Sequence, residues 1–388
     1  MINYGKQFLD RKDILSVAKV LSSNWLTQGP YVEKFEKALK KKFGSKYCSV
    51  VANGTAALHL AGIALGWKHK DIVIGSSLSF VASSNAIVYS GATPDFVDID
   101  KNTYTIDVEK LEKKIKFYLN KGKKVSAVVA TDYAGHPCNW EALKAISKKY
   151  NVKLVNDNCH AIGANFKSDE KYAVKFADIV THSYHPVKNI TTGEGGAILT
   201  NNKIIATKIR MLRTHGITKN PNLMSKNEGP WYYEMKELGY NYRITDFQCA
   251  LGLSQLKKLN KFTKKRKEIA KIYNSSFYEN NFLKIPNITT GYGHAYHLYP
   301  LQINFRNIDQ KKKLFKEFKK KKINLQVHYI PIHLQPYYKK KYGFKRGDYP
   351  ITEKFYNKEV SLPIYYSLKK KEIYKVTRFI NDFCNKNL

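Results

Sequence analysis

One lysine of this chain stands in a setting that suits covalent chemistry. Lys188 lies in the segment THSYHPVKNITTGEGGAILTN (181–201), in a predicted loop between two apolar runs and close to several glycines. An amine held between apolar strands loses solvation, which lowers its pKa and favours attack on a carbonyl to form a Schiff base. An exposed loop lysine in a lysine-rich protein is the alternative, and it would be preferred if Lys188 stood alone.

An acidic residue and a histidine follow another apolar run, in VNDNCHAIGA (155–164). Asp157 is expected at the end of a parallel strand, at the edge of the sheet where ligands bind. There it could hold a protonated ring nitrogen of a cofactor, although a surface-loop aspartate is the alternative. His160 follows three residues later, and taken alone it is more often a structural histidine than a catalyst.

A strand-to-helix junction offers a candidate phosphate site. The chain has neither of the common phosphate motifs, GxGxxG and GxxxxGK. Instead, Asn53-Gly54-Thr55-Ala56 stands where free backbone N–H groups and the positive end of a helix dipole favour an anion, and Thr55 adds a hydroxyl. An Asn-Gly turn with Thr55 as the N-cap of the helix explains the same residues equally well.

The elements that must position these residues are expected within residues 47–201. Short β-rich runs alternate there with helical stretches at 55–65, 80–90, 108–119 and 140–150, and strands are expected at 47–52, 71–76, 93–99, 124–132, 153–158, 178–184 and 196–201. Strands this apolar, joined through helices, indicate a mainly parallel sheet that is covered on both faces. In such sheets the ligand lies at the carboxyl ends of the strands, where the motifs above fall.

The pattern changes near residue 255. A long lysine-rich helix, expected over 255–279, leads out of the alternating region, and shorter elements with many tyrosines follow it. A domain boundary is therefore expected near 254–256, with a large domain over 1–254 and a smaller one over 255–388.

The composition excludes several classes of protein. With 388 residues, 43% of them hydrophobic and 25% charged, the chain can bury a sizeable core, which excludes a disordered protein. No apolar run approaches the roughly 18 residues that a membrane span requires, and the N-terminus does not read as a signal peptide. The five scattered cysteines suggest neither a disulfide framework nor a metal site, so we expect free thiols in a reducing cytoplasm.

The formal charge of +36 raises nucleic-acid binding as an alternative. Against it, the lysines are spread through every predicted surface helix, only eight of the 67 basic residues are arginines, and no DNA- or RNA-binding motif is present. A solvated lysine-rich surface is the favoured interpretation, with some power to attract an anionic small substrate. We expect no nucleic-acid partner and no membrane partner.

The phosphate cradle, strand-end aspartate and loop lysine occur in an order that resembles the fold-type-I pyridoxal-phosphate (PLP) enzymes. The segments NGTAALHLA, DNCHAIGA, SYHPVKNITTGEGGA and LGYNYRITDFQCALGLSQL are similar to those of the DegT/StrS-type nucleotide-sugar aminotransferases, over nearly the whole chain. The resemblance implies an α/β fold with a mainly parallel seven-stranded sheet in the large domain and a smaller α+β C-terminal domain. The segments HPVKNITTGEGG and QVHYIPIHLQPYY (326–338) look most like members that act in the pseudaminic-acid pathway.

The resemblance also implies roles for cofactor residues. Lys188 matches the lysine that bonds to the PLP aldehyde, Asp157 matches the partner of the pyridinium nitrogen, and His160 stands next to the phenolic oxygen. Phe80 matches the aromatic residue that stacks on the ring. Phosphate contacts are implied for Thr55, Ala56 and Ser183, and for Asn241 of the neighbouring subunit. One departure is that Asn156-Asp157-Asn158-Cys159 replaces the more usual Glu-Asp-Ala-Ala or a similar run.

Substrate contacts are implied for a second set of residues: Tyr4, Leu26, Thr27, Gln28, Gly29, His328, Tyr329, Ile330 and Pro331. A packing role for Tyr4 and a core role for Leu26 remain open as alternatives. Arg243, two residues after Asn241, is a candidate for binding the α-carboxylate of glutamate.

The implied reaction transfers an amino group from L-glutamate to C4 of a UDP-linked 4-keto-6-deoxy-N-acetylhexosamine, through the PLP and pyridoxamine (PMP) forms of the cofactor. The implied assembly is a homodimer with shared active sites. A C3 or C4 aminotransferase acting on a dTDP- or GDP-linked keto sugar is the nearest alternative. A PLP-binding dehydratase or a non-catalytic sensor is another, although Lys188 argues against dehydratases in which histidine replaces that lysine.

Overall fold

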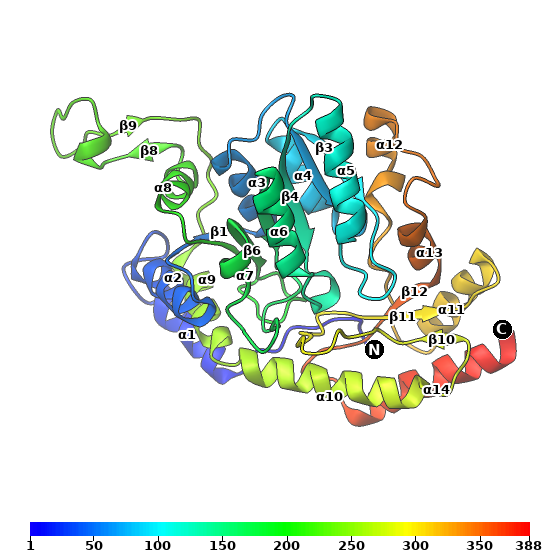
Figure 1. Ribbon diagram of the computed structural model, residues 1–388. Helices are drawn as coiled ribbons and strands as arrows, with labels where there is room; N and C mark the ends of the chain where they lie inside the picture. Colours follow the sequence, from blue (N-terminus) through cyan, green and yellow to red (C-terminus); the bar gives the residue numbers. More distant parts are fainter.

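A seven-stranded sheet forms the centre of the molecule (Figure 1). The computed structural model describes all residues from 1 to 388. The strand order is β1-β7-β6-β5-β4-β2-β3, and every neighbouring pair is parallel except the two pairs that β7 makes. The strands are β1 (Tyr47–Val51), β2 (Ile72–Ser76), β3 (Thr93–Val97), β4 (Val125–Thr131), β5 (Lys153–Asp157), β6 (Ile179–Ser183) and β7 (Gly196–Thr200). The predicted mainly parallel sheet is confirmed, and every strand predicted for it is present.

Helices cover both faces of this sheet because each central strand is apolar on both sides. Val128 of β4 packs in a cluster with Leu111 and Trp140, whereas its neighbour Val129 packs in a second cluster with Leu58 and Ile205. The helices on the first side include α2 (Pro30–Phe43), α5 (Val108–Asn120) and α6 (Trp140–Tyr150), and those on the second are α3 (Gly54–Ala64), α4 (Val81–Tyr89) and α8 (Lys203–Leu212). The alternation of side chains along a strand therefore supplies both halves of the core.

The helix predicted over 255–279 is confirmed over most of its length, but its first two residues belong to a separate helix that ends at Leu256. Helix α9 (Asp246–Leu256) ends before Lys258, and α10 (Leu259–Phe277) begins after it. The amine of Lys258 lies 2.6 Å from Asp10 and 2.7 Å from Asp13, the two residues that form the capping box of α1 (Arg11–Leu21). This contact holds the end of α9 against α1, while α10 runs on along the edge of the molecule beside the C-terminal helix α14 (Lys370–Asn387) (Figure 1).

The C-terminal part has an apolar core of its own, drawn from residues 269–384 together with Ile2. Its sheet is antiparallel and consists of β10 (Leu283–Lys284), β11 (Tyr299–Ile303) and β12 (Glu359–Leu362). Its helices are α11 (Ile308–Lys320), α12 (Pro336–Tyr342), α13 (Pro350–Lys358) and α14 (Lys370–Asn387). The α+β character expected for this part is confirmed, whereas a boundary at residues 254/255 stays a prediction.

A hairpin arm that the sequence did not indicate projects from the body of the molecule (Figure 1). Its two strands, β8 (Ile217–Thr218) and β9 (Glu234–Met235), have only two residues each, too few to produce an alternating pattern. The arm and the segment after it carry large exposed apolar side chains, including Trp231 (71% exposed) and Leu238 (78%).

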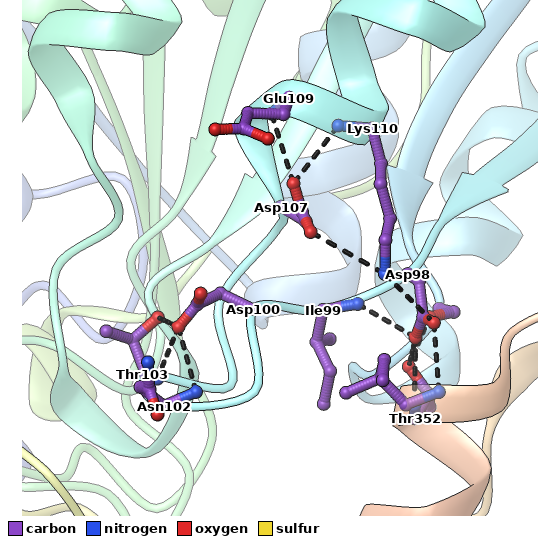
Figure 2. A network of polar contacts seen from close by, with 11 residues as sticks. Asp98, Ile99, Asp100, Asn102, Thr103, Asp107, Glu109, Lys110 and Thr352 are labelled. Atoms are coloured by element: carbon purple, nitrogen blue, oxygen red, sulfur yellow. Dashed lines mark hydrogen bonds and ion pairs between the residues drawn. The ribbon is translucent and has the colours of Figure 1, made fainter.

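A buried carboxylate joins the large sheet to the segment that precedes β12 (Figure 2). Asp98, one residue after β3, accepts hydrogen bonds from the N–H groups of Ile351 (2.9 Å) and Thr352 (2.8 Å) and from the Thr352 hydroxyl (2.7 Å). These N–H groups belong to the first turn of α13, where the helix itself offers them no acceptor. Lys110 lies 3.4 Å from the same carboxylate. Asp98 therefore caps a C-terminal helix from the end of an edge strand of the large sheet.

We predict that Asp98→Ala lowers the free energy of unfolding by about 2–4 kcal/mol, because it leaves buried helix N–H groups without acceptors. Urea unfolding followed by fluorescence measures the change. Asp382→Ala is the matched control, since Asp382 contacts Arg378 only at 3.8 Å on the exposed face of α14; its effect should stay within about 0.5 kcal/mol. Equal losses in the two variants would contradict the role of Asp98.

Candidate active site

A cavity of about 590 Å³ opens at the carboxyl ends of β4, β5 and β6. Thr131, Asp157 and Ser183 line it from the last positions of these three strands. His297 and the segment 326–329 line it from the C-terminal part. The cavity therefore lies where a parallel sheet binds ligands, and residues far apart in the sequence enclose it.

Lys188 lines this cavity from the loop between β6 and β7, so it is not an ordinary exposed lysine. The loop is fixed by buried polar contacts: the Asn189 amide donates to the carbonyls of Ile162 (2.9 Å) and Ala295 (3.3 Å). Burial lowers the pKa of the Lys188 amine, while the nearby Cys159 and Asp157 partly oppose that shift. A larger fraction of the amine is thus neutral, as nucleophilic attack requires.

Asp157 is the last residue of β5 and is buried at the base of the cavity. One of its oxygens accepts a hydrogen bond from the Ser83 hydroxyl at 2.5 Å, and the other accepts one from the backbone N–H of Cys159 at 3.3 Å. Ser83 belongs to α4, so a helix on one face of the sheet orients the carboxylate at its edge. A buried carboxylate in a cavity wall is suited to a cationic ligand atom.

The hydrogen bonds of His160 determine which of its ring nitrogens carries the proton. Its Nδ1 accepts from the backbone N–H of Ala134 at 3.3 Å, so a neutral ring is protonated at Nε2 and donates to the Tyr329 hydroxyl at 3.0 Å. Burial, and secondarily the charge of Lys188, lowers the pKa of His160 well below its usual range, which keeps the ring neutral. Tyr329 accepts this hydrogen bond and keeps its own proton to donate elsewhere, and its side chain lines the cavity.

The predicted phosphate cradle is the first turn of α3. Asn53, not Thr55, is the N-cap, and its side-chain oxygen accepts from the N–H of Ala56 at 2.8 Å. The alternative with Thr55 as the cap is therefore wrong. Gly54 is required by close packing, because a Cβ there would lie 2.8 Å from the Cβ of Ser183. The hydroxyl residues Thr55 and Ser183 both line the cavity.

The structure brings together only part of the predicted site. Nine predicted residues line the cavity: Tyr4, Thr55, Phe80, Asp157, His160, Ser183, Lys188, His328 and Tyr329. The others do not line it within this chain: Ala56, Leu26, Thr27, Gln28, Gly29, Asn241, Arg243, Ile330 and Pro331. Among the latter, Gln28, Gly29 and Arg243 line a separate hollow of about 350 Å³.

His297 and Ser83 are among the cavity residues that the sequence analysis missed. His297 precedes β11, and its Nε2 lies 3.4 Å from the Lys188 Nζ. The buried Arg266 fixes this position by donating to the carbonyls of Tyr296 (3.0 Å) and His297 (3.1 Å). Neither of these two missed residues stands in a local pattern that predicts contact with Lys188 or Asp157.

We predict that Lys188 becomes reactive at a lower pH than an ordinary lysine. Because burial lowers its pKa, the neutral amine forms at a lower pH. In the cofactor-free protein the acylation rate of Lys188 should therefore reach half its maximum below pH 10.5, the ordinary pKa of a lysine. Pulse acylation across a pH series with peptide mass spectrometry measures it, and the same peptide from the urea-unfolded chain is the reference. Equal midpoints in the folded and unfolded chain would contradict the prediction.

Known proteins resemble this chain along nearly its whole length. It is 37% identical over 382 residues to the UDP-4-amino-4,6-dideoxy-N-acetyl-beta-L-altrosamine transaminase of Campylobacter jejuni, a match that covers 98% of this chain and 96% of that protein. The structure of Helicobacter pylori PseC, an aminotransferase involved in the biosynthesis of pseudoaminic acid, superposes with a TM-score of 0.90 at 30% identity, covering 99% of both chains.

The PMP-form of a sugar aminotransferase, Spr1654 from Streptococcus pneumoniae, matches with a TM-score of 0.91 at 26% identity over the full length of both chains. Aminotransferases of this kind depend on PLP, so the cofactor predicted from the sequence is confirmed at the level of the family. The family model itself matches residues 7–381. The chain belongs to the DegT/DnrJ/EryC1/StrS aminotransferase family.

Proposed function

We propose that this aminotransferase moves an amino group from L-glutamate to C4 of a UDP-linked 4-keto-6-deoxy-N-acetylhexosamine. The observation that carries the chemistry is the placement of Lys188, Asp157 and the first turn of α3 around one cavity. The UDP-sugar in the name of the Campylobacter jejuni relative and the pathway of the Helicobacter pylori protein support the substrate class.

The residues present fit PLP. Asp157 supplies a buried carboxylate for the ring nitrogen, and Lys188 supplies the amine for the aldehyde. The start of α3, with Thr55 and Ser183, offers donors for the phosphate. Phe80, 54% exposed at the cavity, offers an aromatic face for the ring. When bound, PLP supplies an electron sink for the substrate carbon that loses its proton.

Lys188 is the proton carrier in this proposal. Its Nζ, whose pKa is lowered by burial, takes the proton from Cα of the amino donor when neutral and later gives a proton to C4 of the sugar. His297, whose Nε2 lies 3.4 Å from this amine, holds the side chain at the cavity wall. The neutral His160 and the hydroxyl of Tyr329 add polar groups to the same wall without adding charge.

We further infer a homodimer in which each cavity is completed by its neighbour. Asn241, Arg243 and residues 26–29 do not line the cavity of their own chain. Exposed apolar side chains, Trp25 (57% exposed) and those of the hairpin arm, provide surface for such a contact. In this arrangement Asn241 reaches the neighbour's phosphate site, and Arg243 binds the glutamate carboxylate. The cytoplasm remains the expected compartment.

A panel of 4-keto sugars linked to UDP, dTDP or GDP, each assayed with glutamate, tests the substrate assignment. We predict efficient turnover of the UDP-linked N-acetylated sugar and much slower turnover of the others. Lys188→Ala is the control, and it should accept PMP without multiple turnovers. Preference for a dTDP- or GDP-linked sugar would replace the proposed substrate, and multiple turnovers by Lys188→Ala would remove the catalytic role of that lysine.

Mixed dimers test whether the sites are shared. Lys188→Ala and Asn241→Ala chains are unfolded together and refolded, and activity is measured at limiting cofactor. If Asn241 acts on the neighbouring cavity, random pairing restores about a quarter of the wild-type sites, because one site of each mixed dimer holds both native residues. Refolding each variant separately is the control. Activity no greater than the sum of the separate variants would contradict shared sites.

A further inference from the structure

A buried chain of hydrogen bonds runs from β12 to the wall of the cavity. Glu359 and Ser361 lie two residues apart on β12, and both side chains are fully buried. One Glu359 oxygen accepts a hydrogen bond from the Ser361 hydroxyl. The other accepts one from the backbone N–H of His328 at 3.0 Å. The Ser361 oxygen in turn lies 2.8 Å from Nδ1 of His328, whose ring lines the cavity.

The single proton of the Ser361 hydroxyl fixes the direction of this chain. An ionised carboxylate can only accept, so Ser361 donates to Glu359 and must accept from His328. His328 is therefore protonated at Nδ1. Burial, with a smaller contribution from Lys188, lowers the pKa of His328 to about 3, so its ring carries no second proton. Its Nε2 is left as a bare acceptor with no hydrogen-bond partner in the chain.

We propose that Glu359 and Ser361 hold His328 in this tautomer so that its Nε2 accepts a hydrogen bond from the sugar substrate. The donor on the sugar is a hydroxyl or the N–H of an acetamido group. Glu359 and Ser361 are positioning residues that act through His328. The identity of the ligand as a sugar rests on the proposed function, whereas the tautomer follows from the hydrogen bonds of an ionised Glu359.

The direction of the hydrogen-bond chain requires an ionised Glu359, and the pH decides whether this side chain is ionised. Burial raises the pKa of Glu359 to about 7, and the hydrogen bond from Ser361 and the charge of Lys311 on α11 partly oppose that shift. Experiments at about pH 8 lie above this pKa, so the carboxylate is the main form of Glu359 in them.

Substituting Glu359 tests the direction of the chain. In Glu359→Gln the remaining side-chain oxygen keeps the hydrogen bond from the His328 backbone N–H. The new NH₂ group therefore faces Ser361 and donates a hydrogen bond to its hydroxyl oxygen. The Ser361 hydroxyl then donates to Nδ1, and the proton of His328 moves to Nε2. Long-range ¹⁵N–¹H spectra of ¹⁵N-histidine-labelled protein report the tautomer, and His328→Gln identifies the signal. We expect Nδ1–H in the wild type and Nε2–H in Glu359→Gln.

Substituting Ser361 tests the consequence for binding. Ser361→Ala removes the acceptor of Nδ1, so the fixed tautomer should be lost and KM for the sugar nucleotide should rise roughly 2- to 12-fold. The half-reaction with glutamate should not change by more than about twofold, since a general structural defect would impair both halves. Ser275→Ala on α10, whose hydroxyl donates only to its own helix at Lys271, is the control and should leave both halves unchanged.

Two results would overturn the inference: an unchanged His328 tautomer in Glu359→Gln, or equal impairment of both half-reactions in Ser361→Ala. If Glu359→Gln does not fold, the His328 signal of Ser361→Ala decides, because the proposal requires that it differ from the wild type. Failure of the wild type to turn over any UDP-linked sugar would refute the proposed function, yet the spectra would still decide the tautomer.

Discussion

An amine kept out of water at the edge of a parallel sheet is the constraint on which the rest of this structure depends. Lys188 must lose solvation to stay partly neutral, yet it must remain open to a cavity that substrates can enter. The loop that carries it is therefore fixed by buried hydrogen bonds from Asn189. Asp157, held by Ser83, places the opposing charge at the end of the neighbouring strand. These features cost stability when considered alone, and the close packing of the sheet offsets that cost.

Long-range polar contacts join the two parts of the chain around that amine. Arg266 fixes the segment that carries His297, and Asp98 caps a C-terminal helix from the edge of the large sheet. Glu359 and Ser361 hold His328 from β12. Each is a buried charge or hydroxyl that is satisfied by polar groups distant from it in the sequence or on a neighbouring element. A buried charge costs desolvation free energy unless it is paired. The site can therefore form in only a small number of arrangements.

The sequence predicted most of the large sheet because the signal is local. Apolar runs separated by helical stretches identify parallel strands, and Lys188, Asp157 and Thr55 stand at their ends. What the sequence did not show depends on distant partners. His297 follows no pattern that relates it to Lys188, and the break at Lys258 depends on two aspartates near the N-terminus. The proposed roles of Asn241 and Arg243 likewise depend on a surface shared by two chains, which no local pattern of residues describes.

The central claim concerns which of the 59 lysines carries the cofactor, and covalent trapping tests it most directly. Protein freshly reconstituted with PLP is treated with borohydride, which makes the bond between lysine and cofactor permanent, and is then digested for peptide mass mapping. We predict a stoichiometric adduct on the peptide that contains Lys188. An adduct on a different lysine, or no adduct at all, would contradict the account.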